Sequence, residues 1–311
     1  MTLVFMGTAP FAVPSLRALV DAGHTIAAVV TQPDRAHGRG LRQRESAVKQ
    51  AARALNLPLL QPERTSHPDF VEALHALSPA AIVVIAYGQI LRPAVLDIPP
   101  RGCINVHGSL LPELRGAAPI QWSILRGCAR TGVTTMFMDV GMDTGDVLLT
   151  AETAIHTDDT AGTLAERLAP IGAELLVETL RQLQAGTLVR RTQDSTRATY
   201  APMLKREDGA LRWDLPAAEV RNRIHGCNPT PGAYARRGET VIKLWRAAIV
   251  PDGSGPAGTV LGTSPLTVAT ADGALCLMEV QPESRGRMAG EAFALGYRVQ
   301  RGEIWLPGEL M

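Results

Sequence analysis

The chain has 311 residues, about the length of two ordinary domains, and 46% of them are hydrophobic, enough to build buried cores. Its net charge of +1 excludes a strongly basic nucleic-acid-binding protein, so any RNA contact must come from local patches. The four cysteines are widely spaced, which argues against a zinc ribbon or a disulfide framework, and no apolar run approaches the ~20 residues that cross a membrane. We therefore expect a cytoplasmic protein without a signal peptide or a membrane partner.

The first 186 residues alternate short apolar runs with helical patterns. Strands that are apolar throughout and separated by helices are typical of a mostly parallel sheet covered on both faces. We therefore expect residues 1–186 to form a doubly wound, Rossmann-like α/β domain. The expected strands are 3–6, 25–31, 80–86, 103–106 and 133–138. The expected helices are 11–22, 45–55, 69–77, 118–127 and 160–184.

The composition changes after residue 186. Residues 187–206 carry five arginine or lysine residues against the single acidic residue Asp194, which predicts a basic linker. Residues 207–311 hold short apolar segments between Gly, Pro and Asp turns, a spacing typical of a compact barrel or sandwich. We expect a smaller, OB-like β-barrel there, with a short strand and a helix within 211–226 and another helix at 289–295. The other expected strands are 234–235, 241–245, 258–261, 267–269 and 275–280.

Asn105 and His107 stand two residues apart at the end of a predicted strand. Alternate residues of a strand share a face, so both polar groups should point the same way. Most lone histidines are satisfied core residues. Here, however, Gly108 and Ser109 end the strand at the carboxyl edge of the sheet, where open α/β sheets bind ligands. This pair is therefore our first candidate for chemistry.

A second polar loop follows the next predicted strand and contains Asp139, Asp143 and Asp146. Such a loop can simply be a turn in which an aspartate bonds its own backbone. A fixed amide donor, a titratable ring and a carboxylate are also the groups needed to move an acyl group onto an amine. Spacing alone does not choose among the three aspartates. We expect no metal, because no cluster has the spacing of metal ligands.

Residues 32–44 form a predicted loop that is rich in arginine and glycine. The usual interpretation is a solvated, charged loop. The alternative is a flexible cationic finger that contacts a phosphate backbone, and the sequence favours neither. The preceding Gly7-Thr8 turn lacks the G-x-G-x-x-G pattern, so a dinucleotide site is unsupported.

Several of these motifs together resemble the methionyl-tRNA formyltransferases, a family of folate-dependent formyltransferases. The matching segments are Asn105-Val-His107-Gly-Ser-Leu-Leu-Pro112, Arg115-Gly-Ala-Ala-Pro-Ile-Gln121 and Asp139-Val-Gly-Met-Asp143. Smaller matches, among them Thr199-Tyr200-Ala201, extend the resemblance over nearly the full length. Thr230 departs from the family pattern, which has Trp after Asn-Pro.

The resemblance implies formyl transfer from the co-substrate 10-formyltetrahydrofolate to the α-amino group of methionyl-initiator tRNA, for translation initiation. It implies that Asn105, His107 and Asp143 are catalytic. The folate-binding residues implied by the same match are Ser109, Leu110, Leu111, Pro112, Gln89 and Leu91, the last two through a strand whose backbone holds the pterin in relatives.

For the tRNA we expect two basic stretches that hold the acceptor arm, one in the loop at residues 32–44 and one in the linker. The residues expected to make these contacts are Arg35, Arg39, Arg42, Lys205 and Arg206. We expect the protein to act as a monomer. Two other hypotheses stay open: a sugar-nucleotide or purine-precursor formyltransferase with the same catalytic set, and a non-catalytic RNA-binding protein, against which the intact trio argues.

Overall fold

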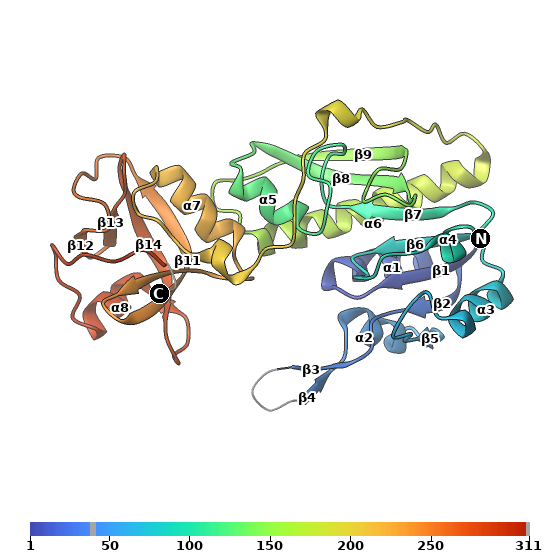
Figure 1. The fold of residues 1–311 in the computed structure, drawn as a ribbon, viewed down its shortest axis with the longest axis horizontal. Coiled ribbons are helices and arrows are strands. Elements are labelled where there is room, and N and C mark those ends of the chain that lie inside the picture. The colour runs from blue at the N-terminus through green and yellow to red at the C-terminus, as the bar shows by residue number, and fades with distance from the viewer. Residues whose placement is uncertain (38–41, 309–311) are drawn as a thin grey trace. The chain divides into compact units, whose positions relative to one another are not determined.

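The structure is a computed structural model that describes residues 1–37 and 42–308. The chain divides into two compact units (Figure 1). Unit 1 comprises Met1–Gly116, Gly132–Thr153 and Ala165–Tyr200, and unit 2 comprises Ala117–Thr131, Ala154–Leu164 and the chain from Ala201 onward. The predicted basic linker is thus divided, since its residues 187–200 belong to unit 1 by their contacts. The boundaries at 186 and 206 stay predictions.

Over the described residues, unit 1 is built on a seven-stranded sheet in the order β5-β2-β1-β6-β7-β8-β9. All recorded pairings from β5 to β7 are parallel, and β8 runs antiparallel to β7. The strands are β1 Thr2–Gly7, β2 Thr25–Val30, β5 Leu59–Leu60, β6 Ala81–Ile85, β7 Cys103–His107, β8 Arg130–Phe137 and β9 Val147–Ala154. The prediction of a mostly parallel α/β sheet is therefore confirmed.

Helices cover this sheet. They are α1 Val13–Asp21, α2 Ala47–Ala54, α3 Pro68–Leu77, α4 Pro93–Leu96 and α6 Ala161–Ala185, and the helix α5 Pro119–Leu125 belongs to unit 2. The start of α2 is set by Ser46, whose hydroxyl accepts a hydrogen bond from the backbone N–H of Lys49. Helix α6 packs closely on β7 and β8 (Figure 1). A Cβ atom added at Gly172 would lie 3.0 Å from Val106 of β7 and 3.3 Å from Val133 of β8, so glycine permits this close approach.

The predicted loop at residues 32–44 contains a two-stranded antiparallel hairpin. Its strands are β3 Arg35–His37 and β4 Arg42–Arg44, with Arg35 opposite Arg44 and His37 opposite Arg42. Residues 38–41, and with them the predicted tRNA contact Arg39, lie outside the described residues. The two short strands of this hairpin were not predicted.

Unit 2 contains an antiparallel sheet in the order β10-β11-β14-β13-β12, with β15 beside β14. The strands are β10 Ala233–Arg237, β11 Thr240–Val250, β12 Val260–Thr263, β13 Leu266–Ala269, β14 Ala274–Pro282 and β15 Met288–Ala289, and the helices α7 Ala217–Gly226 and α8 Gly290–Gly296 accompany them. Near the C-terminus, Ile304 bridges to Thr259 and Leu306 bridges to Arg236, which joins both edges of the sheet. The expected antiparallel domain is confirmed, and its OB-like classification stays a prediction.

The core of unit 2 depends on a few large side chains. Trp213 and Trp305 are buried and meet edge to face at 6.4 Å between ring centroids, and Phe293 packs against Trp305 in the same way at 6.0 Å. The strand predicted within 211–226 is only an isolated bridge between Ala210 and Tyr234. Its hydrophobic residues Leu211 and Trp213 instead enter the core as part of an irregular segment.

His225, in the last turn of α7, makes unit 2 sensitive to acid. Burial lowers the pKa of this imidazole to about 4, and its Nε2 accepts a hydrogen bond of 3.2 Å from the backbone N–H of Ala247. The unfolded chain binds this proton near the ordinary pKa of 6.5, so protons favour unfolding between these two values. The contribution of neutral His225 to the free energy of unfolding is fully present above pH ~6.5 and is lost as the pH falls toward ~4.

We expect the free energy of unfolding to drop by up to about 3 kcal/mol over this pH range because of His225 alone. Urea unfolding at pH 7 and pH 4.5 measures this. His225→Gln keeps a neutral acceptor for Ala247 and should lose this part of the pH dependence. An identical pH dependence in the variant would show that His225 is not responsible.

Candidate active site

Asn105 lies in β7, between β6 and β8, and its side chain is fixed by the neighbouring strand. The Nδ2 group donates a 3.0 Å hydrogen bond to the backbone oxygen of Val84 in β6. A carbonyl oxygen can only accept, so this contact also fixes which end of the amide is nitrogen. The Oδ1 atom is buried and has no partner among the described residues. One N–H and one oxygen of this amide therefore remain for a ligand.

His107 ends β7 and is 6% exposed. Its Nε2 lies 3.0 Å from the backbone oxygen of Leu114 and must donate to it. Its Nδ1 lies 3.7 Å from Oδ2 of Asp143, too far for a hydrogen bond and within reach of an ion pair when the ring is protonated. The structure thus fixes Nε2 as the nitrogen that donates to Leu114 and leaves Nδ1 facing the carboxylate of Asp143.

Asp143 reaches His107 because its loop turns sharply. Its backbone φ is +56°, in the left-handed region that costs free energy for any residue with a side chain. The Oδ2 atom accepts a 2.7 Å hydrogen bond from the backbone N–H of Gly116. The side chain is 18% exposed. One carboxylate oxygen is therefore held between a backbone donor and the imidazole.

The other two aspartates of this loop have different partners. Asp139 is exposed, and its Oδ1 accepts hydrogen bonds from the N–H of Gly141 and the hydroxyl of Thr144. Asp146 accepts from the hydroxyl of Thr192 at 3.0 Å. Of the three candidates that spacing left open, Asp143 is the one that lies beside His107. The catalytic role of the trio remains a proposal.

Two residues of the predicted linker take part in this site and were not predicted. The hydroxyl of Thr199 accepts from the N–H of Leu114, and its backbone oxygen accepts from the N–H of Arg115. Gln193 donates to the backbone oxygens of Asp143 and Gly145 at 2.9 and 2.7 Å. The Thr199-Tyr200-Ala201 match was a signal for Thr199. Gln193 gave none, because it lies fifty residues after the loop that it contacts.

The predicted folate segment Ser109–Pro112 is firmly attached to β8. The hydroxyl of Thr134 donates to the backbone oxygen of Ser109 at 2.7 Å and accepts from the N–H of Leu111 at 3.1 Å. Ser109 is buried, and its hydroxyl donates to the backbone oxygen of Glu113. Leu110 and Pro112 are partly exposed, whereas Leu111 is buried. The segment is thus a rigid turn next to His107, and its contact with folate stays a prediction.

The side chain of Gln89 is hydrogen-bonded within the protein, and that of Leu91 is buried. The Gln89 amide accepts from the N–H of Thr65 at 3.0 Å and donates to the oxygen of Glu63 at 3.1 Å, and Leu91 is 4% exposed in the core. Ile90 between them is 70% exposed. The contact of a folate with the backbone of this segment stays a prediction.

The hairpin with Arg35 and Arg42 is anchored at its base. Lys49 is 7% exposed at its side chain and donates to Oδ2 of Asp34 at 2.5 Å, while Gln61 donates to Oδ1 at 3.0 Å. The hydrogen bond from Lys49 is the main cause that lowers the pKa of the Asp34 carboxyl. Lys205 and Arg206 are exposed and belong to unit 2. Their tRNA contacts stay predictions.

Comparison with known proteins identifies the family. A profile described as formyl transferase matches residues 1–180, and one described as formyl transferase, C-terminal domain, matches residues 203–298. The methionyl-tRNA formyltransferase of Solibacter usitatus is 50% identical over 311 residues, covering 100% of both chains. That of Pelotomaculum thermopropionicum is 48% identical, covering 98% of both. The chain belongs to the methionyl-tRNA formyltransferase family.

Solved structures show how widely the fold of these methionyl-tRNA formyltransferases is shared. HypX from Aquifex aeolicus, in complex with tetrahydrofolic acid, has a TM-score of 0.66 at 18% identity and covers 96% of this chain and 47% of its own. An N-formyltransferase from Helicobacter canadensis, in complex with folinic acid and dTDP-3-aminofucose, has a TM-score of 0.66 at 16% identity and covers 90% of this chain and 98% of its own. At these identities the likeness shows the fold alone.

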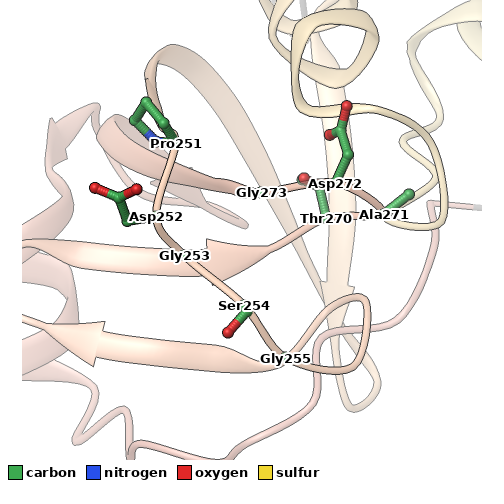
Figure 2. Close-up of a pocket in the computed structure, with 9 residues that line it drawn as sticks. All are labelled: Pro251, Asp252, Gly253, Ser254, Gly255, Thr270, Ala271, Asp272 and Gly273. Atoms are coloured by element: carbon green, nitrogen blue, oxygen red, sulfur yellow. The ribbon is translucent and has the colours of Figure 1, made fainter.

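Two hollows lined by described residues of unit 2 contain none of the predicted site residues. One, of about 430 Å³, lies between residues 251–255 and 270–273 (Figure 2). Asp272 at its rim caps α7 by accepting from the N–H of Ala217. The other, of about 330 Å³, is lined by residues of α5 and α7, among them Trp122 and Arg223. Within residues 1–37 and 42–308 there is no group of three metal-ligating side chains and no helix long and apolar enough to span a membrane.

Proposed function

We propose that this chain transfers the formyl group of 10-formyltetrahydrofolate to the α-amino group of methionyl-initiator tRNA. The observation that carries the proposal is the position of Asp143 beside His107, two residues along β7 from Asn105, in a chain that matches methionyl-tRNA formyltransferases over its full length. The products are N-formylmethionyl-tRNA and tetrahydrofolate. The reaction serves translation initiation.

The reaction begins when the neutral amine attacks the formyl carbon. A carbon–nitrogen bond forms, and the carbonyl oxygen becomes an oxyanion in a tetrahedral intermediate. The free N–H of Asn105 and a protonated Nδ1 of His107 are suited to stabilise that oxyanion, because charge-assisted donors in a buried site are strong.

The intermediate then collapses with two proton movements. Asp143 accepts the proton that the attacking nitrogen loses, directly or through water. The bond between the formyl carbon and N10 of the folate breaks, and N10 takes up a proton that His107 can supply from Nδ1. A bridging water lets Asp143 return a proton to Nδ1, because the 3.7 Å between the two atoms is too long for a direct hydrogen bond. Each group thus ends the cycle in its starting state.

The buried polar atoms of the site fit a ligand with hydrogen-bond donors. The Oδ1 atom of Asn105 has no partner within the described part of the chain, and leaving such an atom unsatisfied costs ~1–3 kcal/mol. A bound donor N–H, such as the attacking amine, would satisfy it. This supports a nitrogen nucleophile at Asn105 over a purely structural role for the amide.

The acceptor is tested with purified protein, 10-formyltetrahydrofolate and three amines. These are methionyl-initiator tRNA, an amino-sugar nucleotide and glycinamide ribonucleotide. We expect formylation of the tRNA at a kcat/KM at least ~10³-fold above that for the other two. Preferential formylation of either small amine would replace the proposed acceptor.

The hairpin is proposed to bind the tRNA backbone. Replacing Arg39 and Arg42 by alanine should raise KM for methionyl-tRNA about tenfold, which corresponds to ~1.4 kcal/mol, and leave KM for the folate donor unchanged. The dependence of tRNA affinity on salt should also weaken, by a slope of about two for two lost phosphate contacts. Steady-state kinetics and binding at several salt concentrations measure both effects.

Arg17 provides a matched control, since it is exposed on α1 outside the hairpin. Arg17→Ala should leave both KM values and the salt slope unchanged. If the double variant behaved like this control, the hairpin would be a solvated surface feature and the tRNA would have to be held elsewhere.

A further inference from the structure

Gln193 is a buried side chain whose four hydrogen bonds connect two parts of the site. It is 9% exposed. Its Nε2 donates to the backbone oxygens of Asp143 and Gly145, at 2.9 and 2.7 Å. Its Oε1 accepts from Nε and Nη2 of Arg115, at 3.1 and 2.8 Å. The amide therefore joins the aspartate loop to the segment that follows Ser109–Pro112.

The orientation of this amide is determined by its neighbours. A guanidinium can only donate and a backbone carbonyl can only accept, so the oxygen must face Arg115 and the nitrogen must face the loop. Arg115 is 3% exposed, and none of the ion pairs recorded for the described residues includes it. A buried guanidinium without a carboxylate depends strongly on the acceptors that it has. Arg115 and Gln193 thus hold each other in place.

Asp143 is held at both its side chain and its backbone by contacts that depend on the Arg115–Gly116 segment. The N–H of Gly116, the residue after Arg115, donates to the Asp143 carboxylate at 2.7 Å. Gln193, fixed by Arg115, donates to the Asp143 backbone oxygen. The left-handed φ of +56° at Asp143 costs free energy and persists only where surrounding contacts enforce it. The hydrogen bonds from Gly116 and Gln193 hold Asp143 in this conformation.

We propose that Gln193 is a positioning residue of the transfer reaction, which holds Asp143 against His107 with Arg115 as its own orienting partner. The inference rests on the proposed function of the trio. It predicts that the effect of Gln193 on turnover passes through Asp143. A displacement of ~1 Å in such a group can cost ~10²-fold in rate.

Gln193→Glu tests this role with little change of shape. One carboxylate oxygen keeps Arg115 as its partner, and the other faces the oxygens of Asp143 and Gly145, which it repels. We expect kcat to fall between tenfold and hundredfold, with KM for the folate donor unchanged. Gln193→Met, which removes the hydrogen bonds at similar volume, should show the same direction. Gln184→Glu, an exposed change on α6 in the same unit, should leave kcat unchanged.

A double-mutant cycle separates positioning from general damage. In the Asp143→Asn background, measured by single-turnover kinetics, Gln193→Glu should cause little further loss, because the carboxylate that it positions is gone. A full multiplication of the two losses would overturn the proposal. So would wild-type kcat in both Gln193 variants.

Amide hydrogen exchange at Gly116 gives a readout without activity. We expect Gln193→Glu to speed exchange of this N–H, which donates to Asp143, and Gln184→Glu to leave it unchanged. Unchanged exchange in the Gln193 variant would overturn the positioning role. If the wild-type protein failed to formylate methionyl-tRNA while exchange responded as expected, the proposed function would fall and the structural role of Gln193 would stand.

Discussion

His107→Ala and Asn105→Ala should each lower kcat for formyl transfer by at least ~10²–10³-fold. Loss of one oxyanion donor typically has this effect, because the remaining groups cannot reorganise to replace it. Both side chains lie at the end of β7 and are fixed by backbone carbonyls, of Val84 and Leu114 respectively. KM for the folate donor should change little, since the contacts with the oxyanion are made in the transition state.

His75→Ala is the matched control for the imidazole. His75 is exposed in the last turn of α3, and its replacement should leave turnover unchanged. The circular dichroism spectra of all variants should match that of the wild type. Near-normal turnover of folded His107→Ala or Asn105→Ala protein would refute the assignment of these donors.

Asp143→Asn should lower kcat by ~10²–10⁴-fold, the range that a positioned acid or base contributes. The amide keeps the shape of the side chain but cannot accept the amine proton or pair with protonated His107. Asp139→Asn and Asp146→Asn should change kcat only a few-fold. Their side chains satisfy local donors, Gly141 with Thr144 and Thr192 respectively, and do not face the ring.

The comparison among the three aspartates is measured with one substrate preparation at one pH. The ranking matters more than any single value, because all three changes remove one charge from the same loop. If Asp146→Asn proved the most damaging, the assignment of Asp143 would be wrong. If all three were equally mild, no loop carboxylate would act in the reaction.

Much of unit 1 could be predicted because its strands are apolar from end to end. β1, β2, β6, β7 and β8 lie within a few residues of the expected ranges. β9 was missed because it is an edge strand whose partly exposed, mixed residues form no continuous apolar run. The hairpin was missed because its arginine-rich sequence has no apolar face.

The site was predictable where neighbours in sequence are neighbours in space. Alternation along β7 placed Asn105 and His107 together, and the polar loop after β8 offered a carboxylate. The choice of Asp143 required the left-handed turn and the Gly116 contact, which spacing does not encode. Gln193 was beyond sequence reasoning, because an isolated glutamine in a polar segment gives no sign of a partner fifty residues earlier.

The most direct test of the central claim follows both halves of the reaction at once. Purified protein is incubated with 10-formyltetrahydrofolate and charged methionyl-initiator tRNA, and the N-formylmethionine ester and the tetrahydrofolate are both quantified. We expect the two products in equal amounts, and neither in the Asp143→Asn protein above its expected residual rate. Release of tetrahydrofolate without formylated tRNA, or formylated tRNA without the folate donor, would contradict the transfer proposed here.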